Sequence, residues 1–328
     1  MSGSESREAA SESIRIREVT TAERPGGSGA PAMRQPRPHR KTTVLRFLPL
    51  VPALLILLAF LAGPIIYSVY LAFTNRALRG EGSSNTEFVG FANFAEAFSS
   101  PGLWNAVWLT LVFTFLSAVI GQNILGMILA LLMRSANKFV TALTSAIIIA
   151  AWILPEVVAA YLWSTFLGQE GTLNVIANAL GLPSQDLLFS FPILAVAFAN
   201  IWRGTAFSML VYRAALTQVS PDVWESAQID GAGAFRRFFS ITVPLIRRSI
   251  LTNLMLITLQ TLSVFGLIYI MTAGGPGTAS QTLPLFMYEQ AFSFGQLGYG
   301  TAVALLLLAI GAIASLIYMR LLPKEDKS

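Results

Sequence analysis

The chain has 328 residues, of which 54% are hydrophobic and only 12% are charged, and its formal net charge at pH 7 is +5. This composition excludes a soluble globular protein of ordinary make-up. Cysteine is absent and the single histidine, His39, lies in a polar stretch, which excludes disulfides, thiol catalysis and histidine-based metal or catalytic centres. We therefore expect neither a metal nor a cofactor in this chain.

The N-terminal residues 1–42 are rich in Ser, Glu, Arg, Pro and Gly and show no periodic apolar face. Such a composition predicts a disordered tail. The apolar stretch that follows is longer than the hydrophobic region of a signal peptide, so we interpret it as an uncleaved membrane span. The membrane domain is expected to occupy residues 43–328.

Six apolar segments follow the tail, each long enough to cross a bilayer as a helix, which takes roughly 20 residues. They are Phe47–Thr74, Leu103–Met133, Phe139–Leu167, Leu188–Leu210, Ile250–Thr272 and Tyr299–Leu322. The pattern predicts an all-α, polytopic membrane protein with six transmembrane helices.

The basic residues are distributed unevenly between the two sides of these segments. Of the 22 Lys and Arg, 19 lie in the two termini and in the second and fourth connections, whereas Arg76 and Arg79 lie on the other side and Arg203 lies within a span. The positive-inside rule places both termini in the cytoplasm of a plasma membrane protein. A bilayer explains the positive charge better than nucleic acid, which we do not expect as a partner.

The fourth connection contains a polar segment, 225–244, that is built like a docking helix. Ser220 can cap a helix, Pro221 suits its first position and Asp222 suits its first turn. Gly231 allows the backbone to break about three turns later. The residues alone leave open whether this is a docking element or an ordinary loop with solvated helices.

The segment resembles the loop by which ABC importer permeases dock onto their ATPase. The matching positions are Glu225, Ser226, Ala227, Asp230, Gly231, Ala232, Phe238, Ile241 and Pro244. The resemblance implies the type I ABC importer permease fold, with 221–234 as a coupling helix in a groove of the ATPase. Two positions in and just after this segment depart from the family. Ser226 replaces the usual Ala, and Arg248 replaces a second Pro, which predicts a straighter start to the fifth span.

Two segments expected outside the membrane narrow the resemblance to the carbohydrate-uptake branch. Phe88–Phe94 is similar to its Phe-Val-Gly-x-x-Asn-Phe/Tyr signature, and the segment from Thr272 is similar to its Thr-x-Gly-Gly-Pro loop. The Thr-x-Gly-Gly-Pro loop resembles that of one subunit type, exemplified by the first permease of maltose and glycerol-3-phosphate importers. The resemblance implies that Gly274, Gly275 and Pro276 form an outer gate or a contact for the binding protein; a simple turn is the alternative.

The same resemblance implies a set of residues along the substrate path. They are Glu156, Arg203, Gly204, Phe207, Gln260, Thr261 and Val264. Each has a structural alternative: Arg203 could pair with Glu156, Phe207 could pack between helices, and Gln260 and Thr261 could join helices by hydrogen bonds. Gly266 stands where many relatives carry Asp, which leaves the pattern of sugar contacts open.

The chain contains no Gly-x-x-x-x-Gly-Lys-Ser/Thr loop, so ATP has to be bound by another subunit. The resemblance implies a non-catalytic permease that assembles with a second related permease, two ATPase subunits and an extracytoplasmic solute-binding protein. The alternatives are an importer of glycerol-3-phosphate, glycerophosphodiesters or polyols, an ion-coupled secondary transporter, and a structural membrane protein. The sequence does not name the sugar.

Overall fold

The computed structural model describes residues 51–322, so the predicted tail 1–42 lies outside the described part. The chain divides into two units, 1–56 and 57–328. Only 51–56 of the first unit are described, and they are helical. The described part of the second unit is built from helices, with one isolated bridge between Thr74 and Phe88.

Each predicted span corresponds to one or more helices, with π-helical turns labelled η. In chain order they are α2 (Val51–Leu57), η2 (Leu58–Ala62) and α3 (Gly63–Ala72); α6 (Pro101–Thr114), η3 (Phe115–Gln122) and α7 (Asn123–Ser135); α8 (Lys138–Ile153) and α9 (Glu156–Leu167); α12 (Pro192–Thr217); α16 (Arg247–Leu262) and α17 (Gly266–Met271); and α19 (Leu297–Leu321). The connections contain α4 (Glu81–Ser84), α5 (Ala92–Ser99), α10 (Thr172–Ala179), α11 (Leu187–Ser190), α13 (Pro221–Ile229), α14 (Ala234–Arg237), η4 (Phe238–Thr242), α15 (Val243–Leu245), α18 (Leu283–Tyr288) and η5 (Glu289–Ser293).

Within the described residues, four helices are long and apolar enough to cross a bilayer, and two bent helix pairs reach the same standard when each pair is counted as one span. The helical, polytopic fold is therefore confirmed. The two bent pairs show where the helices are interrupted.

The third predicted span is broken at Leu154 and Pro155. Helix α8 and the α9–α10 segment meet at an angle of 103°. Leu154 has an extended ψ of 132°, as expected for a residue before proline, and Pro155 has no N–H to continue the helix. The third apolar segment therefore consists of two helices that meet at Pro155.

The fifth span starts with a sharp bend and not with the straight helix that Arg248 led us to expect. The segment Ala234–Leu245 meets α16 at 73°, and the bend lies at Ile246, whose φ and ψ are −98° and 12°. Ile246 is buried, and Pro244 just before it cannot donate to the preceding turn. One proline is therefore sufficient for the bend.

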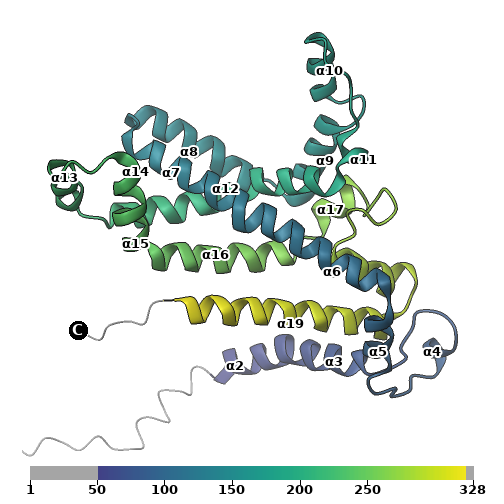
Figure 1. Ribbon diagram of the computed structural model, residues 1–328. Coiled ribbons are helices and arrows are strands. Elements are labelled where there is room, and N and C mark those ends of the chain that lie inside the picture. The colour runs from purple at the N-terminus through teal and green to yellow at the C-terminus, as the bar shows by residue number, and fades with distance from the viewer. Residues whose placement is uncertain (1–50, 323–328) are drawn as a thin grey trace, which may run out of the picture. The chain divides into compact units, whose positions relative to one another are not determined.

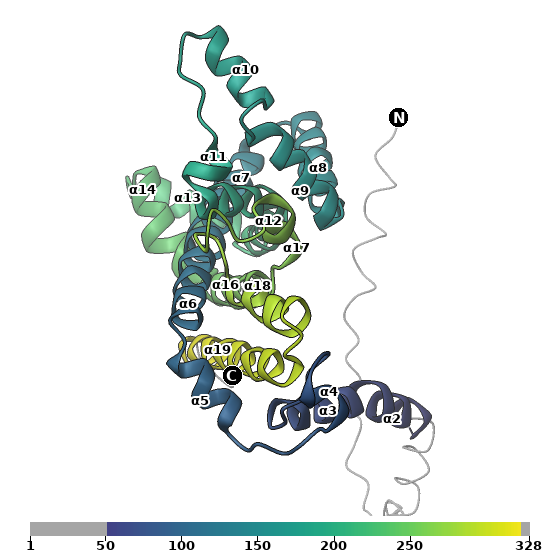
Figure 2. The same cartoon turned by 90° about the vertical axis from the view of Figure 1, so that its right-hand side faces the viewer.

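Helix α12 lies at the centre of the helices, packed against α7, α8, α9 and α16, while α19 packs between α16 and α3 (Figure 1). Helices α13–α15 lie at one end of α7, α12 and α16, and α5 and α17 lie at the other end (Figure 1). Helix α10 projects away from the remaining helices in both views (Figure 2).

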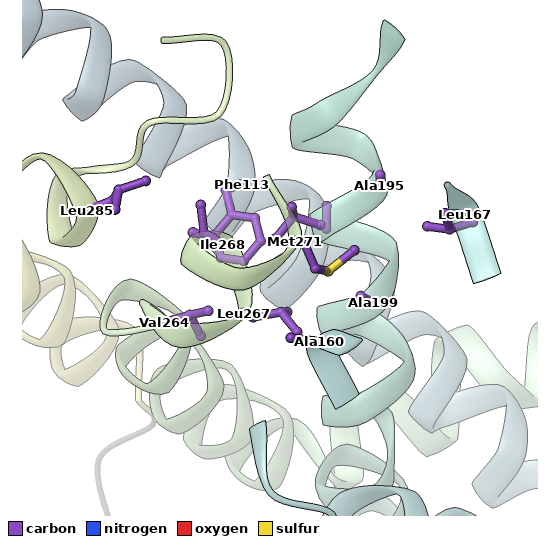
Figure 3. Close-up of a cluster of buried hydrophobic side chains, with 12 residues drawn as sticks. Phe113, Ala160, Leu167, Ala195, Ala199, Val264, Leu267, Ile268, Met271 and Leu285 are labelled. Carbon is purple, nitrogen blue, oxygen red and sulfur yellow. The ribbon is translucent and has the colours of Figure 1, made fainter. Parts of the chain in front are cut away.

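The largest apolar cluster joins the two broken spans to α12 (Figure 3). Its members come from α6, α9, α12, α17, α18 and the turn before α17, and include Phe113, Ala160, Ala195, Ala199, Val264, Leu267, Ile268, Met271 and Leu285. The alanines of α9 and α12 are small enough for the helix backbones to approach closely, which is typical of helix packing in membranes. The cluster fixes α17 against α9 and α12.

Candidate functional site

The residues around Glu225 form a short helix, α13, whose start is specified by its own sequence. Ser220 Oγ accepts a hydrogen bond of 3.3 Å from the amide of Asp222, and Pro221 occupies the first turn. Asp222 places a negative charge near the positive end of the helix dipole. The predicted beginning of this helix is confirmed.

The end of α13 is a Schellman motif centred on Gly231, whose φ is +72°. Its amide donates to Gln228 O, and the amide of Ala232 donates to Ala227 O, both at 3.0 Å. This geometry needs a left-handed residue and favours glycine. The helix therefore stops at residue 229, before the end of the expected 221–234 segment, and the chain turns into α14.

One face of α13 is open and the other is packed. Glu225, Ser226 and Asp230 are exposed, so these polar groups are available to another subunit. Ala227 is only 7% exposed, and Trp224, one turn earlier, is partly buried. Ala227 thus belongs to the packed face of this helix, whereas the resemblance had placed it in the ATPase contact.

Trp224 anchors α13 to the end of the second span. The guanidinium carbon of Arg134, in the last turn of α7, lies 4.1 Å from the centre of the Trp224 ring. Arg237 of α14 lies 5.9 Å from the same ring. Cation–π contacts of this kind are each worth about 0.5–1 kcal/mol or more. The exposed acids of α13 are therefore presented by a helix that is attached to a membrane span.

Three of the expected substrate-path residues are packed inside the chain. A Cβ on Gly204 would lie 2.2 Å from Oε1 of Gln122, so this glycine permits close contact between α12 and η3. Thr261 is buried and its Oγ1 accepts from Asn200 Nδ2 at 3.5 Å. Val264 belongs to the apolar cluster of Figure 3. These positions have a structural role in this conformation.

The two intramembrane charges do not pair with each other. Glu156 Oε1 accepts a hydrogen bond of 2.7 Å from the amide of Leu267, and a Cβ on Gly266 would lie 3.4 Å from the same oxygen. Nε of Arg203 is buried and has no hydrogen-bond partner among the described residues. The suggested ion pair is absent from residues 51–322, and Arg203 is left with an unused donor.

Phe207 and Gln260 have different surroundings. Phe207 is partly buried, with its ring 6.0 Å from that of Trp152 on α8, as expected for packing between helices. Gln260 is exposed near the end of α16. Among the described residues, no hydrogen bond or ion pair joins Glu156, Arg203 and Gln260 to one another. The structure thus leaves Arg203 and Gln260 as the polar candidates with free hydrogen-bonding capacity.

The Gly-Gly-Pro loop is a closed turn held by Ser280. Ser280 Oγ donates to Thr272 Oγ1 at 2.8 Å and to Gly275 O at 3.0 Å, and its amide donates to Gly274 O. Gly274 has φ +82° and Gly275–Pro276 is a cis peptide bond. The turn also contacts α6, where Asn105 Nδ2 donates to Thr278 O at 3.1 Å.

The first outer signature, Phe88–Phe94, lies where the end of α3 meets the start of α19. Asn93, from the Phe88–Phe94 segment, donates through Nδ2 to Ala72 O and Thr74 O at 2.8 and 2.9 Å. A Cβ on Gly298, which follows the Gly-Gly-Pro loop, would lie 2.0 Å from the same Thr74 O. Asn93 therefore satisfies the end of α3, and Gly298 lets α19 approach it.

A buried polar cluster was not predicted. Asn253 Nδ2 on α16 donates to Asn123 Oδ1 and Ser208 Oγ at 3.0 Å and to Tyr212 OH at 3.1 Å, and Tyr212 OH also donates to Asn123 Oδ1. These residues join the three helices α7, α12 and α16 to one another. The sequence signal that could have revealed this cluster is the presence of single Asn residues in otherwise apolar spans.

The comparisons with known proteins agree with this geometry. The family described as "Binding-protein-dependent transport system inner membrane component" matches residues 122–327. The chain belongs to this family. The match begins at Gln122, so it covers α13 and all the substrate-path candidates named above.

Relatives of this inner membrane component extend the similarity to most of its length. The sulfoquinovosyl glycerol transport system permease protein SmoG of Agrobacterium fabrum is 32% identical over 86% of this chain and 92% of its own. The trehalose/maltose transport system permease protein MalF of Thermococcus litoralis is 29% identical over 84% and 92%. A chain of a bacterial alginate ABC transporter, solved in complex with an alginate pentasaccharide-bound periplasmic protein, has the same fold with a TM-score of 0.74, at 24% identity over 88% and 97%.

Proposed function

We propose that this inner membrane component is the translocation subunit of an ATP-driven importer that carries an oligosaccharide, a disaccharide or a related glycoside across the plasma membrane. The exposed acids of α13, anchored through Trp224 to α7, carry the proposal, since they form a rigid attachment point at one end of the spans. The substrate class is supported by the sulfoquinovosyl glycerol and trehalose/maltose relatives.

The working importer would contain a second related permease, an ATPase dimer that binds ATP and Mg²⁺, and an extracytoplasmic binding protein. The alginate transporter complex, which includes a periplasmic protein, supports such an assembly. The uneven distribution of Lys and Arg supports cytoplasmic termini and a cytoplasmic α13. Closure of the ATPases would move α13 as a rigid body and switch access to the pathway. This chain would perform no bond chemistry.

The proposal is tested by co-purification and uptake. An ATPase and a second permease should purify with the wild-type chain, and Glu225→Lys should release the ATPase and abolish uptake while the chain still inserts. Glu170→Lys makes the same charge change at an exposed residue after α9, and this variant should retain both the ATPase and normal uptake. Retention of the ATPase and of normal uptake by Glu225→Lys would refute the coupling role.

A glycerol-3-phosphate, glycerophosphodiester or polyol importer is the second candidate. Arg203 favours the anionic members of this group, because its Nε is a buried donor without a partner. Thermal-shift screening of the cognate binding protein against sugars, polyols and glycerophosphodiesters separates the two candidates. If Arg203→Gln abolishes uptake of a phosphodiester that the binding protein recognises, the sugar assignment is wrong.

A further inference from the structure

A long apolar groove of about 830 Å³ runs beside the second span, between α7, α16 and the α14–η4 segment. Its apolar lining includes Ile124 and Ile128 of α7, Phe235 and Phe239 of the α14–η4 segment, and Leu254 of α16. Both isoleucines and both phenylalanines are exposed. Sites for small ligands occupy about 300–1,000 Å³, so the groove has the size of a binding site.

One end of the groove is polar and positively charged. Arg237 and Trp224 line it there, with the guanidinium carbon 5.9 Å from the ring centre. Arg237 Nε and Trp224 Nε1 are both buried, and neither has a hydrogen-bond partner within residues 51–322. Buried N–H donors are normally satisfied, so this pair calls for an acceptor.

The charge at this end is not neutralised by the acids nearby. Asp222, Glu225 and Asp230 of α13 are exposed and form no ion pair with Arg237 or Arg134 in the described part of the chain. Arg134 stacks on Trp224 and adds a second positive charge. The complementary ligand is therefore an anion joined to a long apolar group.

We propose that the groove binds an anionic phospholipid, with its phosphate on Arg237 and Trp224 and an acyl chain along Ile124 and Ile128. Ile124 and Ile128 belong to a 35-residue candidate membrane span, Pro101–Ser135, so this part of the groove is available to a lipid chain. Basic pockets between spans on the cytoplasmic side bind anionic headgroups. The assignment to the cytoplasmic leaflet rests on the proposed function, which places α13 on that side.

A helix of a partner permease is the competing occupant. It would cover the apolar walls, but its backbone carbonyls are already used within the helix, so it could accept from the two N–H donors only through a polar or acidic side chain. The lipid accounts for both the apolar length of the groove and its positively charged end.

Native mass spectrometry of the full chain, purified and exchanged into palmitoyl-oleoyl phosphatidylglycerol or phosphatidylcholine, tests the site. The wild-type chain should retain one phosphatidylglycerol in preference to phosphatidylcholine. Arg237→Gln should weaken this retention roughly fivefold, as expected for one lost arginine at an anionic lipid. Arg236→Gln is the matched control, since Arg236 is the exposed neighbour and does not line the groove.

A second pair of variants tests the apolar part of the groove. Ile124→Trp fills it and should displace the phosphatidylglycerol, whereas Leu125→Trp, on an exposed neighbour outside the lining, should not. Equal losses for Arg237→Gln and Arg236→Gln, equal retention of phosphatidylcholine, or unchanged retention in Ile124→Trp would each overturn the site. The readout does not involve the ATPase. Retention of phosphatidylglycerol without ATPase co-purification would therefore refute the proposed function alone.

Discussion

Glu156 on α9 accepts a 2.7 Å hydrogen bond from the backbone amide of Leu267, at the start of α17. The bond joins the break in the third span to the interruption between α16 and α17 in the fifth, and its two residues are 111 positions apart in the sequence. It satisfies one of the amides that a helix start leaves unpaired and places a negative charge at the positive end of α17. Glu156 is therefore a link between two interrupted spans.

Replacing Glu156 should separate its structural role from a role in the substrate path. Glu156→Ala leaves the Leu267 amide unpaired, which costs about 1–3 kcal/mol, and should lower the melting temperature by several degrees. Glu156→Gln keeps an acceptor oxygen and should lower the melting temperature much less. Glu170→Ala, on an exposed residue, is the control. If Glu156→Gln abolished uptake at an unchanged melting temperature, the carboxylate would belong to the substrate path.

Local features of the fold were predictable and long-range ones were not. The beginning and end of α13 follow from Ser220, Pro221 and Gly231, because a cap, a first-turn proline and a left-handed glycine act on their own neighbours. Pro155 also gave a local signal for a break. The contact of α17 with α9 and α12, however, is made by an apolar cluster of residues far apart in the sequence, which no local signal reveals.

The substrate path was harder to predict, because a sequence does not show which way a side chain faces. Gly204 and Thr261 match family positions, yet Gln122 and Asn200 occupy the space beside them. The same polar residue types serve in a pathway and in contacts between helices. The sequence could therefore identify the polar positions but not separate these two roles.

Gly231 should be required for its backbone conformation and not for space. A Cβ at Gly231 would meet no atom within 4 Å, but φ is +72°, a conformation that costs a non-glycine residue about 1–2 kcal/mol. Gly231→Ala should therefore destabilise the end of α13 and reduce ATPase co-purification. Gly233→Ala is the matched control, since Gly233 has equal space and a φ of −62°. Equal co-purification of the two variants would contradict this account.

The Asn253 cluster should stabilise the spans that support α13. Asn253→Ala removes the donor that contacts Asn123, Ser208 and Tyr212, and polar contacts between membrane helices are each worth about 0.6–2 kcal/mol. We expect a lower melting temperature in detergent and weaker uptake. Thr252→Ala, an exposed neighbour on the same helix, should change neither. A wild-type melting temperature for Asn253→Ala would show that the cluster contributes little.

Gly298 should be irreplaceable where α19 meets the end of α3. A Cβ there would lie 2.0 Å from Thr74 O and 3.2 Å from Nδ2 of Asn93, so the backbones would have to separate and the Asn93 hydrogen bonds would be strained. Overpacking of this kind costs about 1–3 kcal/mol or more. Gly298→Ala should reduce the melting temperature and the yield of inserted chain. Gly311→Ala, in the same helix but with its nearest neighbour at 3.6 Å, should be tolerated. Similar melting temperatures for the two variants would mean that α19 does not approach Thr74 and Asn93 as closely as the structure shows.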